Sequence, residues 1–164
     1  MVRVEAGVRL IASVLLGVGL LGAASALSGK AQAAMAPDNV AEELQIAAKE
    51  CRESGGRPNT DAMLKALDFT GKGGPDWIVD FAKLRCEGAL NPFCGSGGCG
   101  LELFTYSGGS DWQKVFDENV LSYRIVNVNR RPALHFVTGG AACGRVNAKS
   151  CTYIYQSGKT RQVQ

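Results

Sequence analysis

The stretch LELFTYSGGSDWQKVFD, residues 101–117, decides the fold class of this chain. Its two halves, residues 101–106 and 111–117, are rich in apolar and aromatic side chains and are long enough to form strands. The four residues between them, Ser107-Gly108-Gly109-Ser110, are small or polar and favour a tight reversal of the chain. The stretch therefore predicts a β-hairpin within an antiparallel sheet.

The pattern of strands and turns continues toward the C-terminus. Residues 123–128 and 133–137 lie on either side of the turn Asn129-Arg130-Arg131 and predict a second hairpin. Residues 151–156 predict a last strand, and we interpret the residues after it as a polar tail.

The segment before the first hairpin also has the period of a strand. Residues 76–81 alternate between two faces, with Trp77, Val79 and Phe81 on one and Asp76, Ile78 and Asp80 on the other. Such a period predicts a strand that is buried on one face and exposed on the other. Residues 63–69 are compatible with either a helix or a strand.

A single helix is predicted near the start of the folded region. Pro37-Asp38-Asn39 opens it, with Asn39 as a cap of the free amides and Glu42 three residues on, as in a capping box. A turn-rich segment at residues 54–59 ends it. Four apolar residues share one face at helical spacing, namely Val40, Leu44, Ala47 and Cys51. The fold class predicted is therefore α+β and mainly β, with an N-terminal helix packed on a small antiparallel sheet of hairpins.

The first residues have the composition of an export signal. An uncharged run of Leu, Val, Ile, Ala and Gly follows Arg3 and Arg9, and Ala31 and Ala33 fit the positions that a signal peptidase reads. We expect residues 1–33 to be a signal peptide and residues 34–164 to form a single domain. Without the signal, the 18 basic and 15 acidic residues become 15 and 14. Such a balanced charge gives no electrostatic case for nucleic acid or an anionic membrane as a partner.

All six cysteines lie after residue 33, and an even number in a small exported domain predicts a disulfide framework. Their spacing is wider than the close pairs of zinc sites, and His135 is the only histidine. The pairs we expect are Cys143–Cys151, Cys94–Cys99 and Cys51–Cys86, with Cys86–Cys94 as an alternative for the last two. The glycine-rich segment between Cys94 and Cys99 is then a stapled turn. We expect the protein in the periplasm or secreted.

Residues 68–80, DFTGKGGPDWIVD, resemble the calcium-loop segment of FG-GAP (VCBS-like) repeats, D-x-[DN]-x-[DN]-G-x-x-D followed by an apolar strand. Asp68, Gly73 and Asp76 match that pattern, whereas Thr70 and Lys72 stand where the family has Asp or Asn. The resemblance implies a metal site at Asp68 and Asp76, with calcium as the one cofactor to consider. Our hypothesis is that the ammonium of Lys72 replaces the ion between the two carboxylates. The loop and the C-G-x-G-G-C turn also resemble small exported bacterial proteins of unknown role.

The sequence offers no constellation of an enzyme. A serine or cysteine nucleophile needs a base, and the one histidine, His135, alternates with apolar neighbours in a predicted strand. Asp76 and Asp80 share one face of a strand about 13 Å apart, too far for a glycosidase pair. We therefore expect a binding or interaction protein with a protein or small ligand. An inhibitor of an envelope or extracellular hydrolase, and a calcium-stabilised structural module, are the alternatives.

Overall fold

The computed structural model describes residues 36–73, 75–140 and 149–163. The elements in this part of the chain are α2 (Asp38–Glu53), β1 (Arg57–Asn59), β2 (Leu64–Leu67), β3 (Asp76–Asp80), the 3-10 helix η1 (Phe81–Lys83), β4 (Arg85–Glu87), β5 (Cys94–Gly95), β6 (Gly98–Gly108), β7 (Asp111–Val120), β8 (Ser122–Val128), β9 (Arg131–Gly139), β10 (Ser150–Gln156) and β11 (Lys159–Val163).

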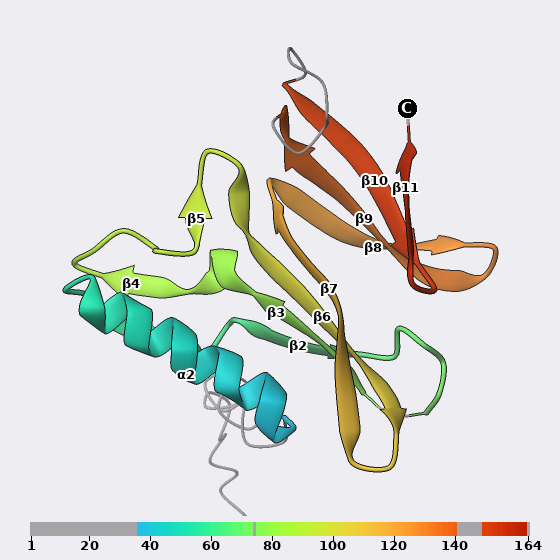
Figure 1. Ribbon diagram of the computed structural model, residues 1–164, viewed down its shortest axis with the longest axis horizontal. Helices are drawn as coiled ribbons and strands as arrows, with labels where there is room; N and C mark the ends of the chain where they lie inside the picture. The colour runs from blue at the N-terminus through green and yellow to red at the C-terminus, as the bar shows by residue number, and fades with distance from the viewer. Residues whose placement is uncertain (1–35, 74, 141–148, 164) are drawn as a thin grey trace, which may run out of the picture.

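The strands form a central sheet, a second sheet and a two-stranded ribbon, all with antiparallel pairing (Figure 1). The central sheet has the order β2-β3-β6-β5, and β7 pairs with the other edge of β6. The second sheet has the order β11-β10-β9-β8, and β1 pairs with β4. The fold class is thus the one predicted, an N-terminal helix with mainly antiparallel sheets.

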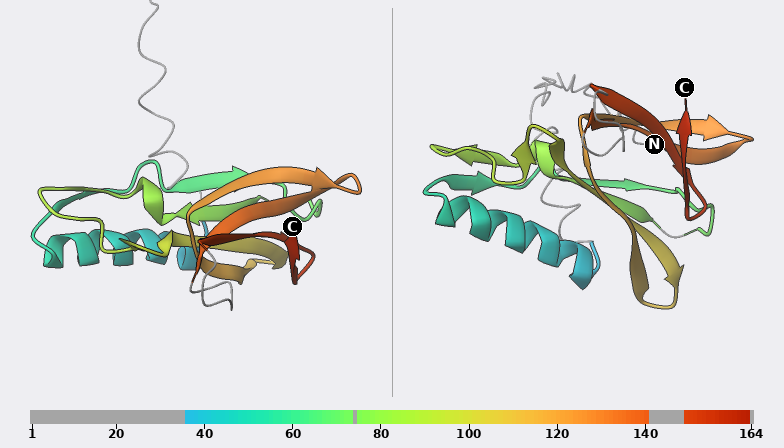
Figure 2. Two further views of the ribbon diagram at one scale, coloured as in Figure 1. Left: turned by 90° about the horizontal axis from the view of Figure 1, so that it is seen from above. Right: turned by 45° about the horizontal axis from the view of Figure 1, so that its top comes forward.

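The central sheet lies between two layers, with α2 on one side and the second sheet on the other (Figure 2). One core joins the helix to Trp77, Val79 and Phe104, and the other joins Ile78 and Leu103 to the second sheet. Every residue of β3 is therefore buried. The prediction that this strand is buried on one face only is wrong, because the second sheet covers the face that carries its aspartates.

Helix α2 has the buried stripe predicted for it, Val40, Leu44, Ala47 and Cys51. Its start differs from the prediction. Pro37 is the N-cap residue and no side chain caps the helix, while Asn39 lies inside the first turn. The Asn39 amide donates to the carbonyl oxygen of Trp112 at 2.8 Å. Asn39 thus joins α2 to β7 instead of capping the helix.

Both predicted hairpins are present, as β6–β7 and β8–β9, and residues 64–67 form strand β2. The residues that we interpreted as a polar tail form a further strand, β11, paired with β10. Ser157 and Gly158, both with positive φ, reverse the chain between the two. The sequence does not reveal β11, because an edge strand that buries little surface can form without alternating apolar and polar residues.

Two of the expected disulfides are present. Cys51–Cys86 joins α2 to β4, and Cys94–Cys99 closes the β5–β6 hairpin. Cys151 is also disulfide-bonded, and its expected partner, Cys143, lies outside the described residues, as do residues 1–33 with the expected signal. Disulfides of this kind indicate an oxidising compartment. None of the helices in the described part of the chain has the length and apolar character to cross a membrane.

Candidate functional site

The aspartate expected to bind calcium, Asp76, is buried and already has partners. Its Oδ2 accepts hydrogen bonds from the amides of Phe69 and Thr70 at 2.7 and 2.6 Å. Its Oδ1 accepts from the amide of Tyr106 at 2.7 Å. Charge-assisted hydrogen bonds from three amides hold the 68–76 loop against β6, so Asp76 organises the loop by itself.

Asp68 and Lys72 do not join this arrangement. Asp68 is exposed and its Oδ1 accepts the amide of Gly71 at 2.6 Å, which is a local turn contact. Lys72 is exposed too, and among the described residues it forms no ion pair with Asp68 or Asp76. The amides of Phe69, Thr70 and Tyr106, and not the ammonium of Lys72, donate to the Asp76 carboxylate. No group of three acidic, histidine or cysteine side chains in the described residues could hold a metal ion. Calcium binding by Asp68 and Asp76 stays a prediction.

Two other residues were considered for catalysis, Asp80 on β3 and His135 on β9. Asp80 accepts hydrogen bonds from the amide of Ala82 at 3.0 Å and from the hydroxyl of Tyr123 at 3.1 Å. Burial, and then the nearby Asp80 carboxylate, raise the pKa of Tyr123. His135 is half-buried on β9. Asp80 is thus a structural acceptor that fixes η1 and β8.

A cluster of charged side chains lies between α2 and the central sheet. Glu43 comes from α2, Glu102 from β6, and Lys114 and Asp117 from β7. The Lys114 ammonium is 2.8 Å from Glu43 Oε1 and 2.6 Å from Glu102 Oε1, and 3.7 Å from Asp117 Oδ2. It also lies 5.5 Å from the centre of the Phe104 ring. One ammonium thus serves three carboxylates, and the cluster carries an excess of negative charge when all are ionised.

Glu102 is the unusual member of this cluster. Its side chain is only 8% exposed, and its Oε2 has no hydrogen-bond partner among the described residues. Burial raises the pKa of Glu102 to about 7, and the hydrogen bond from Lys114 opposes this only in part. For Lys114, burial alone would lower the pKa, but the hydrogen bonds to Glu102 and Glu43 outweigh it and raise the pKa. A buried carboxylate oxygen without a partner is costly, so its presence calls for a functional explanation.

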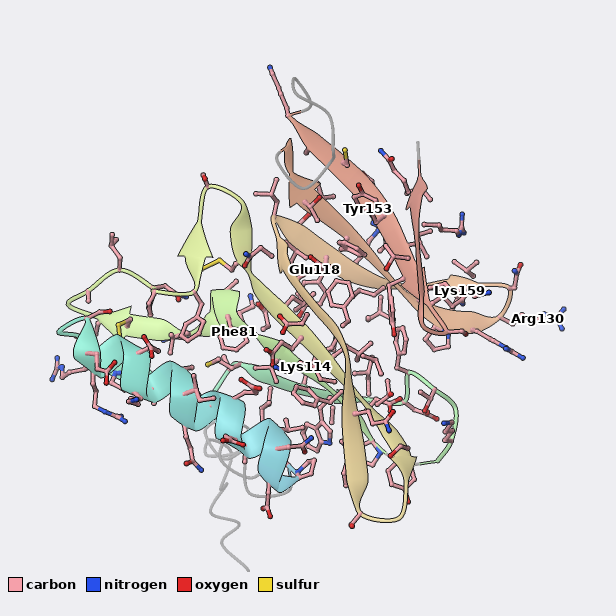
Figure 3. The ribbon with its side chains drawn as sticks, viewed as in Figure 1. Phe81, Lys114, Glu118, Arg130, Tyr153 and Lys159 are labelled. Carbon is pink, nitrogen blue, oxygen red and sulfur yellow. A yellow bond between two sulfur atoms is a disulfide. The ribbon has the colours of Figure 1, made fainter. Side chains whose placement is uncertain are left out.

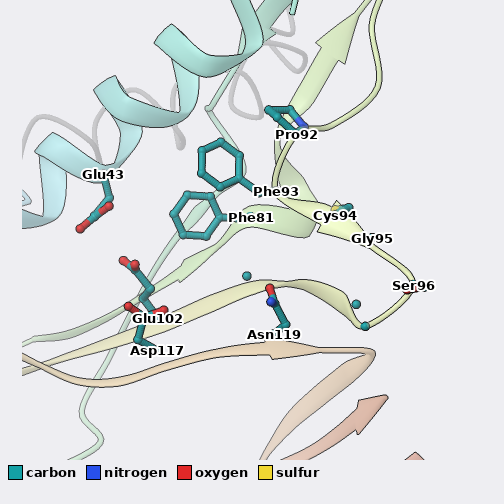
Figure 4. A pocket seen from close by; sticks show the side chains of 13 residues that line it. Glu43, Phe81, Pro92, Phe93, Cys94, Gly95, Ser96, Glu102, Asp117 and Asn119 are labelled. Carbon is teal, nitrogen blue, oxygen red and sulfur yellow. The ribbon is translucent and has the colours of Figure 1, made fainter. Parts of the chain in front are cut away.

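The cluster forms one end of a cavity of about 580 Å³. Glu43, Glu102 and Asp117 line that end, and the Cys94–Cys99 hairpin lines the other (Figure 4). Between them lie Phe81 and Phe93, whose rings stack with centres 4.5 Å apart. Cavities of this size accommodate small organic ligands. The arrangement combines an acidic end with an aromatic wall, which suits a ligand that has a cationic group and an apolar body.

Sequence reasoning missed this site. Glu102 stands in the alternating stretch LELF, where a charged residue between leucines indicates a solvent-facing position. In the structure that face is covered by α2, so the same alternation places Glu102 in the interior. The glycine-rich turn between Cys94 and Cys99 was expected to be structural, and it also lines the cavity.

Comparison with known proteins finds no family model, no curated protein and no solved structure that matches the chain. The resemblance of residues 68–80 to FG-GAP loops therefore gains no support from relatives. The functional argument rests on the geometry of the cavity.

Proposed function

We propose that this chain is an exported binding protein that takes an organic cation, an amine or a guanidinium on an apolar body, in the cavity between α2 and β6. The observation that carries the proposal is the buried Glu102 carboxyl, a lining residue of the cavity whose Oε2 has no hydrogen-bond partner among the described residues. A cationic group at this end of the cavity would be attracted to the carboxyls of Glu43, Glu102 and Asp117.

The charge of the cavity supports a cation over an anion. Three carboxylates gather at one end, and in the described part of the chain Lys114 is the one cation that forms ion pairs with them. A second positive group would relieve the repulsion between Glu102 and Glu43 that adds to the raised pKa of Glu102. The Phe81 and Phe93 rings beside them favour a ligand with an apolar portion over a small hydrated ion.

The disulfides and the N-terminal sequence support a place outside the cytoplasm. Disulfides persist in oxidising compartments, and residues 1–33 have the composition of a signal peptide. A small ligand-binding protein outside the cytoplasm fits both observations. The proposal is for binding without catalysis, since Oε1 of Glu102, whose pKa burial raises to about 7, already accepts a hydrogen bond from Lys114.

The test is calorimetric titration of the oxidised protein with phenethylamine, and with 2-phenylethanol as the neutral probe of similar shape. We expect phenethylamine to bind and 2-phenylethanol to bind at least about tenfold more weakly, the equivalent of one charge-assisted hydrogen bond. Glu102→Gln should weaken phenethylamine by a similar factor. Glu118→Gln is the matched control, because Glu118 lies next to Asp117 on β7 but does not line the cavity.

Two results would contradict this proposal. Equal affinity for the amine and the alcohol would show that the acidic end takes no part in recognition. An equal loss in the Glu102 and Glu118 variants would show that only the overall charge of the protein matters. Melting temperatures of both variants, measured beside the titrations, establish that they are folded.

A further inference from the structure

A second cavity, of about 620 Å³, lies where three turns meet at the end of the two sheets. Its rim consists of the loop from Phe69 to Lys72, the β8–β9 turn with Arg130 and Arg131, and the β10–β11 turn with Ser157 and Gly158. It shares no lining residue with the acidic cavity. Lys72, which we expected to lie between Asp68 and Asp76, lines this second cavity and not the acidic one.

The charge of this cavity is opposite to that of the first. Lys72, Arg130 and Arg131 line it, and no aspartate or glutamate does. Within the described part of the chain, none of these three cations forms an ion pair. Figure 3 shows Arg130 extending outward from the tip of the β8–β9 turn. Three cations without counter-charges on one rim create a positive potential that attracts anions.

The inner wall of the cavity is apolar and aromatic. Phe69 and Tyr155 are buried, their rings are stacked with centres 6.3 Å apart, and Val115 and Pro132 lie beside them. Thr70, Thr105 and Ser157, which carry hydroxyl groups, are also among the lining residues. An apolar interior with a few hydrogen-bonding groups and a charged rim is the usual composition of a small-molecule site.

The backbone of the β8–β9 turn adds an independent observation. Asn129 and Arg130 have φ values of 52° and 63°, between the paired residues Val128 and Arg131. The second position of such a turn favours glycine, because a side chain is sterically disfavoured at positive φ. The β10–β11 turn has glycine at the matching position, Gly158. Arginine at residue 130 is thus a poor choice for the turn, and strain of this kind gathers at functional sites.

We propose that this second cavity binds an oxyanion, a phosphate, sulfate or carboxylate, carried on a flat apolar body. The oxyanion lies at the rim, where Arg130, Arg131 and Lys72 donate to its oxygens. The apolar body lies inward against Phe69 and Tyr155. The arginines supply the paired donors that suit planar or tetrahedral oxyanions. This site is independent of the cation cavity and of the function proposed for it.

The experiment titrates the oxidised protein with phenyl phosphate, benzoate, inorganic phosphate and phenol. We expect phenyl phosphate or benzoate to bind more tightly than inorganic phosphate. Phenol should bind at least about tenfold more weakly than the tighter of these two aromatic anions, which is the ratio of affinities that one charge-assisted contact gives. The aromatic anion that binds more tightly identifies the head group, phosphate or carboxylate, that the rim prefers. Affinity should fall as salt rises, because the rim is exposed.

The variants separate a ligand site from a merely structural turn. Arg130→Gly removes the side chain from a position that glycine prefers, so the melting temperature should stay the same or rise while anion affinity falls at least about fivefold. Lys72→Met should also weaken the anion. Arg85→Met is the control for loss of charge, since Arg85 is exposed on β4 and lines neither cavity. Glu102→Gln should leave anion binding unchanged, which keeps this test separate from that of the cation cavity.

Three outcomes would overturn the oxyanion site. The first is that neither aromatic anion binds at about 10 mM, well above the range of specific sites. The second is that phenol binds as well as phenyl phosphate and benzoate. The third is that Arg85→Met lowers anion affinity as much as Arg130→Gly and Lys72→Met do.

Discussion

Replacing Asp76 with asparagine should destabilise the protein strongly, although the two side chains have nearly the same shape. The carboxylate of Asp76 accepts two amides at Oδ2 and one at Oδ1, and the residue is fully buried. An asparagine amide has one acceptor oxygen, so at least the amide of Tyr106 would face an NH2 group and lose its partner. One unsatisfied buried amide costs about 1–3 kcal/mol, and loss of charge assistance at the other two adds about 1–2 kcal/mol.

Part of this cost is recovered because an asparagine carries no charge to desolvate. We therefore expect Asp76→Asn to lower the free energy of unfolding by about 2–4 kcal/mol, a large part of the 5–15 kcal/mol typical of a domain. The assay is urea unfolding of the oxidised protein, followed by the fluorescence of Trp77 and Trp112. With a slope of roughly 1–2 kcal/mol per molar urea, the midpoint should move by about 1–4 M.

Asp68→Asn is the matched control, because Asp68 makes one exposed turn contact with Gly71 that an asparagine oxygen can also make. Its cost should stay within about 0.5 kcal/mol. Equal costs for the two variants, together with a wild type that melts at a lower temperature in a calcium chelator, would refute this reasoning. Asp68 and Asp76 would then act jointly on a metal ion, as the resemblance to calcium loops implies.

Three further predictions concern the helix side of the central sheet. Gly56→Ala would place a Cβ 2.5 Å from Cys86 Sγ and 3.0 Å from Cys51 Sγ, so it should cost about 1–3 kcal/mol in urea unfolding of the oxidised protein. Lys114→Met leaves Glu43 and Glu102 without their counter-charge and should cost roughly 1–3 kcal/mol at about pH 8 but less at about pH 5, where Glu102 is protonated. Since the pKa of Glu102 is raised from 4.5 to about 7 on folding, the folded state binds more protons between these values, and its contribution to stability decreases as pH rises through them. Unfolding curves at about pH 5 and about pH 8 should show that decrease in the wild type and a weaker one in Glu102→Gln.

The parts of the fold that the sequence predicted are those with strong local signals. The apolar stripe of α2 has helical spacing, and Gly108-Gly109 and Asn129-Arg130 mark the two hairpin turns. These signals depend on neighbours in sequence, so one chain is enough to detect them. The close pair Cys94 and Cys99 could be assigned for the same reason.

The parts that could not be predicted depend on which layers meet. Alternation along β3 and β6 defines two faces but does not reveal whether both are covered. For that reason the face of β3 that carries Asp76 and Asp80 was expected to be exposed, whereas the structure buries both aspartates. Glu102 on β6 is buried as well, and the sequence analysis did not single it out. The acidic cavity is assembled from α2, β6 and β7, whose charged residues lie as far apart as positions 43 and 117, and no local pattern joins them.

Strand β11 has a consequence for how the molecule behaves among its own copies. It pairs along β10, whose Ile154 and Tyr155 are buried, and it faces outward with Lys159 and Arg161. Without it, β10 would present an apolar edge with unpaired amides and carbonyls, which is a template for strand addition and aggregation. A lysine and an arginine on the outermost strand make that addition electrostatically unfavourable between identical chains. The last described residues of the chain thus cover the β10 edge of the second sheet and disfavour the addition of a strand from another copy there.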